Sequence, residues 1–399
     1  MERSKALGFA RRVKRIEVSA IKQMPLLARS VPDAVSLGQG IPSVRTPEYI
    51  RRQVIELLKH DADIGKYSLQ PGVPELKQSV AQKIAQTAGR FIDPELEVFI
   101  SAGAMEALFA AVVSLVDEGD EVILFDPSYA SHIEQVKFAS GTPVFVPLIE
   151  NDGWALDEEL LRRAVSAKTK AVIVCNPGNP TGKVFSVAEL SVIVKIAREH
   201  GLYIIADETY DFLVYDGFCH KSLASFSNIK DMVILCGSFS KEFAMTGWRV
   251  GYMVAPAEVI EQALKVHDAA VICAPTVSQY AALAALTNRA ECKEETVRDV
   301  LARRRELICA RLDSLAEFFS YVQPGGAYYV LPRYLKWDIN SAEFAHRLLF
   351  EAKVITIPGA AFGPGGETHV RMSYGGTEDD INKAFDRIEH WSRMSKRFT

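Results

Sequence analysis

The sequence contains only six cysteines in 399 residues, and no two of them have the spacing of a metal-binding or redox pair. Cys175 and Cys236 lie inside apolar runs of the kind that form buried strands. This pattern predicts reduced core thiols and a cytoplasmic protein. It predicts no metal site.

An excess of one charge is also lacking, since 46 basic residues stand against 50 acidic ones and the net charge is −4. Such a balance argues against nucleic acid or an anionic membrane as a partner. No apolar run is long enough to cross a membrane. The basic amino terminus, with Arg3, Lys5 and Arg11, has only short apolar runs and an early Glu2, which fits neither a signal peptide nor a transit peptide. These absences favour small-molecule chemistry.

Seven short apolar runs indicate the strands of one sheet, and segments of helix length separate most of them. The runs are 98–100, 122–125, 144–146, 171–175, 203–206, 232–236 and 250–254. Alternation of this kind predicts an α/β fold, with a large domain built on a mainly parallel seven-stranded sheet that helices flank. Only the short loop around Lys241 joins the last two runs, so we expect an antiparallel final strand.

The rest of the chain indicates a smaller α+β domain assembled from both chain ends. We expect residues 1–45 to form an arm and part of this domain, residues 46–285 the large cofactor-binding domain, and residues 286–399 the remainder of the small one. Periodicity and turn residues predict helices, which cover 48–60, 74–88, 257–285, 290–318 and 378–393. The chain has no internal repeat and no low-complexity linker.

Chemically apt residues follow five of the predicted strands, at what would be a single edge of the sheet. Gly103 opens a helix with small residues, which favours an anion site, although such helix starts are common. Tyr129 follows a proline turn, Asn179 lies in a loop rich in turn residues, and Asp207 ends a strand. Core packing of Tyr129 and ordinary helix capping by Asp207 stay open as alternatives. Five such loops at one edge are unexpected by chance.

Lys241 follows the sixth apolar run within Ser238-Phe239-Ser240-Lys241. A lysine that is desolvated and near other cations has a lowered pKa, which suits it to form a Schiff base. A solvated surface lysine is the alternative reading of this residue taken alone.

These motifs together resemble the class I aminotransferases, which are pyridoxal-phosphate enzymes of fold type I. The matching motifs are Asn179-Pro-Thr-Gly, Asp207-x-x-Tyr210, Ser238-x-Ser240-Lys241 with Arg249 eight residues on, and Arg371-x-Ser373-Tyr374. The match extends from Gly38 to the carboxyl end. The resemblance implies a homodimeric transaminase that uses pyridoxal phosphate and moves an amino group from an amino acid to a 2-oxo acid by a ping-pong cycle.

The resemblance also implies a role for each matching residue. Lys241 would form the Schiff base and move the proton, Asp207 would pair with the pyridine nitrogen, and Tyr129 would stack on the ring. Asn179 and Tyr210 would contact the phenolic oxygen. The residues implied at the cofactor phosphate are Gly103, Ala104, Ser238, Ser240 and Arg249, with Met105 in the same helix start and Tyr67 reaching in from the neighbouring subunit. Those implied at the substrate are Arg371, which would bind the α-carboxylate, Asn179 and the backbone of Gly40. The resemblance also implies cis peptide bonds at Asn179–Pro180 and Asp126–Pro127.

Two other classes of function stay open from the sequence. One is a cysteine-S-conjugate β-lyase on the same fold, which product analysis would separate from a transaminase. The other is a transcriptional regulator that carries this fold, but we expect none because the fold begins close to Met1 and leaves no room for a DNA-binding domain.

The donor side chain is predicted from what is missing at two positions. Relatives selective for aspartate place a basic residue where this chain has Met105, or near Ala269. A buried carboxylate without a cation is costly, so these residues favour a neutral or aromatic amino donor, with 2-oxoglutarate as acceptor. If Ser19, Lys22 or Gln23 lies in the pocket, however, aspartate or glutamate takes first place as donor.

Overall fold

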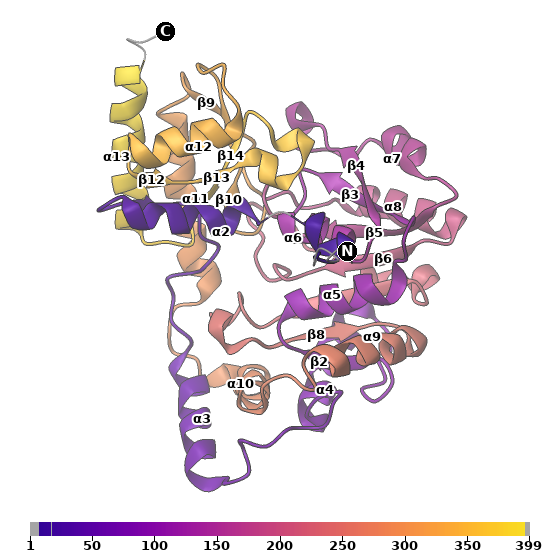
Figure 1. Ribbon diagram of the computed structural model, residues 1–399. Coiled ribbons are helices and arrows are strands. Elements are labelled where there is room, and N and C mark those ends of the chain that lie inside the picture. Colours follow the sequence, from indigo (N-terminus) through magenta and orange to yellow (C-terminus); the bar gives the residue numbers. More distant parts are fainter. Residues whose placement is uncertain (1–7, 17, 396–399) are drawn as a thin grey trace, which may run out of the picture.

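The computed structural model describes residues 8–16 and 18–395. Glu2, Arg3 and Lys5, on which the reading of the amino terminus partly depends, lie outside this range. Figure 1 shows a larger part built around a central sheet and a smaller part in which residues 20–30 lie near the last segment of the described chain.

The central sheet has seven strands in the order β2-β8-β7-β6-β5-β3-β4. These strands are β2 (Val98–Ser101), β3 (Glu121–Asp126), β4 (Thr142–Pro147), β5 (Thr169–Cys175), β6 (Tyr203–Asp207), β7 (Val233–Ser238) and β8 (Gly251–Val254). Strand β8 is antiparallel to both β2 and β7, and the other pairs are parallel. The predicted α/β fold and the antiparallel final strand are therefore confirmed.

Helices cover both faces of this sheet because its side chains alternate between the faces. In β3, for example, Val122 and Leu124 belong to one buried cluster, and Ile123 and Phe125 belong to another. The first face is covered by α5 (Ala104–Leu115), α6 (Ala130–Phe138) and α9 (Ala257–Ala270). The opposite face is covered by α3 (Glu48–His60), α4 (Pro74–Ala88), α7 (Glu158–Ala164), α8 (Val187–His200) and α10 (Thr276–Thr287).

Two helices expected from the sequence differ from the structure. The continuous helix expected over 257–285 is broken into α9 and α10, because Ile272 has a positive φ of 71° and Pro275 provides the N-cap of the second helix. The helix expected over 290–318 is shorter, since α11 spans Val297–Asp313 and begins where Thr296 caps it.

The smaller part joins both ends of the chain. Strand β1 (Val35–Ser36) pairs in parallel with β12 (Val354–Ile355), and β14 (Val370–Ser373) lies between β10 (Tyr329–Val330) and β13 (Ile357–Pro358). Its other main elements are α2 (Ala20–Leu27), α11, α12 (Ser341–Phe350), α13 (Glu378–Ser395) and the pair β9 (Phe319–Ser320) and β11 (Arg333–Tyr334), whereas α1 (Arg11–Lys14) lies against α6 of the larger part. The exact boundaries proposed above, after residues 45 and 285, stay a prediction.

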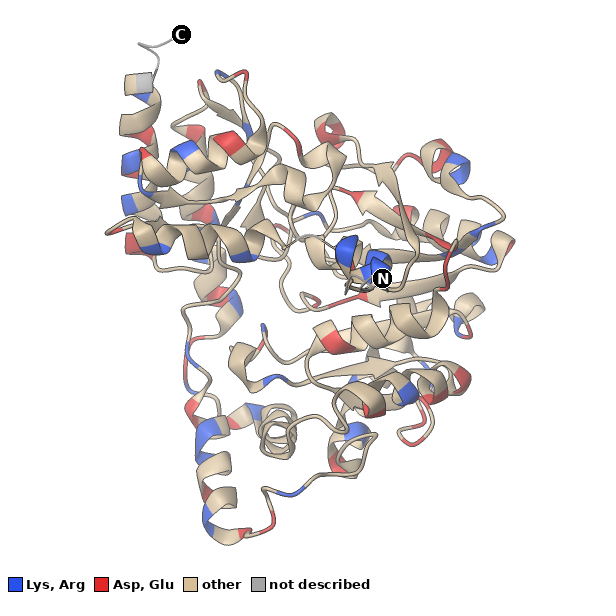
Figure 2. Cartoon of the chain, viewed as in Figure 1, with Lys and Arg blue, Asp and Glu red and all other residues tan. Residues whose placement is uncertain are grey.

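Strands β2, β3, β5, β6 and β7 all end at the same edge of the sheet. The loops that follow them include cis peptide bonds at Asp126–Pro127 and Asn179–Pro180, as expected, and also at Asn176–Pro177, which the sequence did not predict. Basic and acidic residues are interspersed over both parts of the chain (Figure 2). Within the described residues, no helix has the length and apolar character that crossing a membrane requires.

Candidate active site

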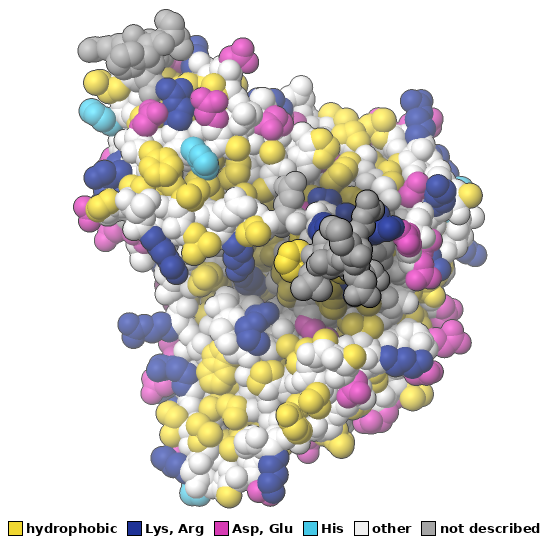
Figure 3. Space-filling view, in the orientation of Figure 1, with side chains coloured by type: hydrophobic (Ala, Val, Ile, Leu, Met, Phe, Trp, Pro, Cys, Tyr) yellow, Lys and Arg dark blue, Asp and Glu magenta, His cyan; other side chains and the backbone are white. Residues whose placement is uncertain are grey.

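A cavity of about 970 Å³ lies at the carboxyl edge of the sheet. Most of the residues predicted for the site line it, namely Gly40, Ala104, Met105, Tyr129, Asn179, Asp207, Tyr210, Ser238, Ser240, Lys241, Arg249 and Arg371. Gly103 is not part of the wall but adjoins Ala104, which is. Helices α2 and α5 both contribute to the wall, and the surface in Figure 3 is hollowed between the upper and lower parts of the molecule.

Lys241 follows β7 and points its amine into this cavity. Its Nζ donates a hydrogen bond to the carbonyl oxygen of Gly40, 2.7 Å away. Burial, together with the positive charges of Arg371 and Arg249, lowers the pKa of Lys241 to about 8. A substantial share of this amine is therefore neutral near pH 8, which is the state that a nucleophile or a base requires.

Asp207, at the end of β6, is the acid of the cavity. His132 Nε2 lies 3.1 Å from Asp207 Oδ2, and Thr209 Oγ1 donates to Asp207 Oδ1 over 2.6 Å. Burial favours the neutral acid, but the hydrogen bonds from His132 and Thr209 outweigh it and hold the pKa of Asp207 below its ordinary value. Asp207 is thus a buried carboxylate that stays ionised.

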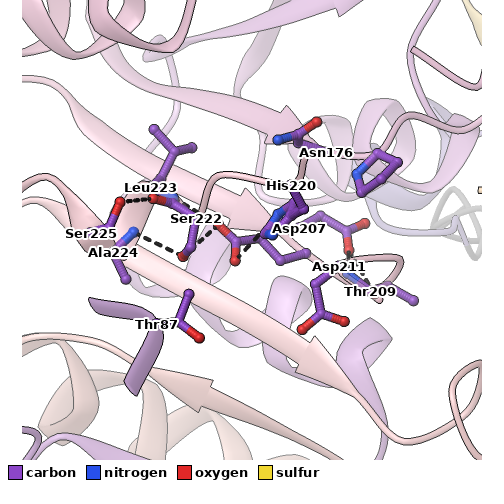
Figure 4. A network of polar contacts seen from close by, with 12 residues as sticks. Thr87, Asn176, Asp207, Thr209, Asp211, His220, Ser222, Leu223, Ala224 and Ser225 are labelled. Atoms are coloured by element: carbon purple, nitrogen blue, oxygen red, sulfur yellow. Dashed lines mark hydrogen bonds and ion pairs between the residues drawn. The ribbon is translucent and has the colours of Figure 1, made fainter. Parts of the chain in front are cut away.

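The next residue, Glu208, has a different environment although it is also buried. Its Oε1 accepts hydrogen bonds from Ser222 Oγ and from the Leu223 amide, at 3.0 and 2.9 Å. In Figure 4, Ser222 and Leu223 lie on one side of Asp207 and Thr209 lies on the other. Burial raises the pKa of Glu208 to about 8. Glu208 therefore anchors a loop, and Asp207 alone of the two carboxylates faces the cavity.

The start of α5 and the neighbouring Arg249 form a cradle for an anion. Gly103, with a φ of +85°, is the N-cap of α5, and a Cβ on it would lie only 2.6 Å from Arg249 Nη2. The Arg249 guanidinium donates to the carbonyl oxygens of Ala102 and Thr246. Free N–H groups at a helix start beside a guanidinium suit a phosphate group, and Ser238 and Ser240 line the same wall.

Arg371, on β14, reaches the cavity from the smaller part of the chain. Its side chain is buried, its Nη2 donates to Gly38 O over 2.6 Å, and its Nη1 donates to Asn179 Oδ1 over 3.1 Å. The guanidinium carbon lies 4.6 Å from the centre of the Tyr329 ring, and Nε has no hydrogen-bond partner among the described residues. A buried guanidinium with unused donor capacity is suited to a carboxylate ligand.

Two tyrosines that sequence reasoning did not assign lie at this wall, and Tyr329 of the two lines the cavity. Tyr329 OH lies 2.9 Å from Tyr210 OH, and Tyr328 OH donates to Gly40 O over 2.6 Å. A Cβ on Gly40 would collide with the Tyr329 hydroxyl, so only glycine fits there. The Gly-Gly turn before these tyrosines was a signal that could have placed them near a ligand.

The cavity wall also includes a basic residue of α2, Lys22, and one of the 3-10 turn that follows it, Arg29. Lys22 and Arg29 line it together with Leu26, whereas Ser19 and Gln23 do not. Met105 and Ser131 lie in the same wall. The condition under which an acidic donor takes first place is therefore met by Lys22. His132, Arg29 and Ser131 were missed, because the sequence gives no sign of which helical side chains face the ligand.

Tyr67 is not brought to the cavity of its own chain and is 76% exposed. Its predicted role in a neighbouring subunit stays a prediction. The cysteines are all free, but Cys219 is exposed, Cys292 is half-buried and Cys175 lines the cavity, so the expectation of core thiols is wrong for these three. Across residues 8–16 and 18–395, no three His, Cys, Asp or Glu side chains are grouped so that they could hold a metal ion.

The fold and cavity define a class of enzyme that comparisons with known proteins identify. Residues 32–388 match the model of the family described as aminotransferase class I and II. The aspartate aminotransferase of Pyrococcus abyssi is 35% identical over 98% of this chain and 100% of its own length. The aromatic-amino-acid aminotransferase 2 of Thermococcus litoralis is also 35% identical, over 96% of this chain and 98% of its own.

Solved structures agree with the sequence relatives. The aspartate aminotransferase of Thermus thermophilus with maleate superposes with a TM-score of 0.89 at 34% identity, over 96% of this chain and 99% of that one. The aromatic aminotransferase of Pyrococcus horikoshii gives a TM-score of 0.86 at 34% identity, over 94% and 99%. The chain belongs to the class I and II aminotransferase family, whose class I members use pyridoxal phosphate, and it is an aminotransferase.

Proposed function

We propose that this cavity binds pyridoxal phosphate and transfers an α-amino group to 2-oxoglutarate. The observation that carries the proposal is the convergence of four groups on one cavity, which are Lys241, Asp207, Arg249 and Arg371. The residues fit the cofactor, because the cradle at Gly103 and Arg249 suits a phosphate, Tyr129 offers a ring face, and Asp207 is an ionised partner for a pyridine nitrogen.

When bound, the cofactor would supply an aldehyde for Lys241 and a protonated ring that withdraws electrons from the substrate Cα. The ionised carboxylate of Asp207 would keep the proton on the ring nitrogen. Asn179 and Tyr210 would contact the phenolic oxygen, and Arg249 would neutralise the phosphate.

The remaining steps belong to this chain's own side chains. Arg371 would bind the substrate α-carboxylate in a bidentate manner, and so turn the Cα toward Lys241. Lys241 Nζ, with its lowered pKa, would take the proton from the substrate Cα and deliver it to the C4′ carbon of the cofactor. Tyr210 and Tyr329, as a hydrogen-bonded pair, would fix the wall between cofactor and substrate.

We expect the preferred amino donor to be acidic, either aspartate or glutamate. Lys22 and Arg29 line the cavity on the α2 side, which supplies the cation that a distal carboxylate requires. The same cations would serve 2-oxoglutarate, so one subsite would explain both half-reactions. The Thermus thermophilus relative was solved with maleate, which is a dicarboxylate.

A neutral or aromatic donor is the second candidate. Met105, Leu26 and Tyr129 give the same cavity an apolar lining, which suits an aromatic side chain. The relative from Thermococcus litoralis is named for aromatic amino acids. A donor panel with 2-oxoglutarate ranks the two candidates, and release of pyruvate and ammonia from a thioether substrate would instead indicate a β-lyase.

The cofactor proposal is tested with Lys241→Ala. We expect this variant to lose turnover and the visible absorbance band of lysine-bound cofactor, because no other amine can replace Nζ at this position. Lys230→Ala, a change at an exposed lysine outside the cavity, is the matched control and should retain both. Full activity of Lys241→Ala would overturn the proposal.

We also propose a homodimer in which Tyr67 contributes to the partner's site. Tyr67 is exposed and does not line its own cavity, and Leu69 beside it is exposed as well. Mixing Tyr67→Ala with Lys241→Ala tests this arrangement, since each mixed dimer would contain one site with neither change. After subunit exchange we expect activity of about a quarter of the wild-type value. The shared-site dimer would be refuted if the mixture were no more active than the two variants measured separately and added. It would also be refuted if light scattering showed a fully active monomer.

A further inference from the structure

Lys83, on helix α4, lies outside the cavity but touches both segments that carry its central residues. Its Nζ is 3.3 Å from Asp211 Oδ2 and 3.4 Å from Glu242 Oε2. Asp211 directly follows Tyr210, and Glu242 directly follows Lys241. One ammonium therefore spans the turn after β6 and the loop after β7.

The three side chains are sheltered enough for this contact to matter. Their exposed fractions are 27% for Lys83, 24% for Asp211 and 8% for Glu242, so solvent and salt screen the pairs less than they screen surface pairs. Burial lowers the pKa of Lys83, but Tyr252 and the two carboxylates outweigh it and raise this pKa well above its usual value. Lys83 is therefore charged at neutral pH.

The loop that Glu242 begins has a backbone that needs external support. Ala244 and Arg249 both have positive φ values, 50° and 53°, which side chains other than glycine rarely adopt. Such conformations persist where surrounding contacts hold them. Thr46 Oγ1 donates to Ala244 O over 2.8 Å on one side of the loop, and Glu242 pairs with Lys83 and Arg289 on the other.

In the turn after β6, one carboxylate likewise faces the cavity and another faces away from it. Figure 4 shows Asp207, Thr209 and Asp211 along this turn, with the carboxylate of Asp211 directed away from that of Asp207. Asp207 thus faces the cavity while Asp211 is available to Lys83. Tyr210, between Thr209 and Asp211, contributes its hydroxyl to the cavity wall.

We propose that Lys83 is a positioning residue, whose ion pairs with Asp211 and Glu242 fix the relative placement of the Tyr210 hydroxyl and the Lys241 amine. The inference rests on the proposed function, because it concerns two groups of the proposed cofactor site. Without Lys83, Glu242 would keep only Arg289 as its cation, no cation would bridge Glu242 to Asp211, and the segments behind Tyr210 and Lys241 would separate. A displacement of about 1 Å in such groups can cost on the order of 100-fold in rate.

The test compares Lys83→Met with Lys83→Arg and with Lys77→Met. Lys77 is a matched control because it lies on the same helix, is 3% exposed and pairs with Glu95 over 2.8 Å, far from the cavity wall. For each variant we would measure kcat and KM, the pH midpoint of the visible band of bound pyridoxal phosphate, the dissociation constant of the cofactor from the apoprotein, and thermal unfolding.

Lys83→Met should lower kcat by about 10- to 100-fold with little change in KM. It should also move the midpoint of the visible band by about half a unit or more. Lys83→Arg should recover most of both properties, and Lys77→Met should change stability alone. If Lys83→Met loses stability but keeps the wild-type midpoint and kcat, Lys83 is only structural and the proposal is refuted. A wild-type protein that gives no visible band with the cofactor would instead refute the proposed function.

Discussion

His132 Nε2 lies 3.1 Å from Asp207 Oδ2, and both side chains are buried. The imidazole comes from α6 and the carboxylate from the end of β6, so two distant parts of the chain define the charge state at the floor of the cavity. Thr209 Oγ1 supplies a second hydrogen bond to the same carboxylate. Asp207 can therefore stay ionised despite its burial.

Removal of the imidazole should raise the pKa of Asp207. The hydrogen bond from the imidazole stabilises the charged form of Asp207, so His132→Ala should move this pKa upward. Because the ionised form is the active one, the acid limb of the profile of kcat/KM against pH should move toward higher pH. Thr209→Val should shift it in the same direction. Coincident profiles for His132→Ala and the wild type would contradict this role.

Removal of the Arg371 guanidinium should weaken binding of both substrates to a similar degree. Arg371→Ala should raise KM for the amino donor and for the 2-oxo acceptor alike, each by about 100-fold, because both substrates carry the α-carboxylate. Arg371→Lys should recover only part of the loss, since an ammonium cannot form the bidentate pair. Steady-state kinetics with each substrate varied in turn decide the matter. A loss confined to one of the two substrates would show that Arg371 has another role.

The sequence predicted the loops at the sheet edge well, and the reason is physical. Parallel strands must end at one edge, so residues that directly follow buried apolar runs, such as Asp207 and Lys241, are brought together by the topology alone. The glycine, proline and asparagine residues of the loop at Asn179 also restrict its backbone, which makes such a loop recognisable.

The sequence could not single out the residues that reach the cavity from helix surfaces. His132 was missed, and Lys22 could be named only together with Ser19 and Gln23, because periodicity does not tell which polar residue of a helix meets a ligand. The break between α9 and α10 had one signal in the sequence, Pro275, which cannot continue a helix, although no glycine marks the positive φ of Ile272. To place Tyr328 and Tyr329 near the cavity, one would have to know where the smaller part of the chain packs against the larger one.

Asp126, at the end of β3, predicts a pH dependence of stability. Its Oδ2 accepts a hydrogen bond from the Gly365 amide over 2.7 Å, its Oδ1 has no partner, and burial raises its pKa to about 6. A raised pKa means that the folded state binds the proton more tightly than the unfolded state. The contribution of Asp126 is therefore fully present below its ordinary pKa near 4 and is lost as pH rises through 6.

Asp126→Asn should remove this dependence, because the amide does not ionise and its oxygen can still accept from Gly365. Between pH 4 and pH 7, the unfolding free energy of the wild type should fall relative to the variant by up to about 3 kcal/mol. Urea unfolding at fixed protein concentration across this range measures the difference, with Asp338→Asn, at an exposed site, as the control. If the free energies of unfolding of the wild type and Asp126→Asn differ by the same amount at every pH in this range, Asp126 does not titrate there.

The last prediction uses a substitution of Lys22 to distinguish an acidic amino donor from an aromatic one. If Lys22 binds the distal carboxylate, Lys22→Met should raise KM for aspartate and for 2-oxoglutarate, but it should leave phenylalanine nearly unchanged. Because Lys22 is exposed, the effect should be about 1 kcal/mol, or roughly fivefold. Lys14→Met removes the same charge from α1 without touching the cavity wall and should change none of these values. Specificity constants for phenylalanine above those for aspartate in the wild type would give the aromatic donor first place. A Lys22→Met variant with unchanged KM for both dicarboxylates would show that the subsite lies elsewhere.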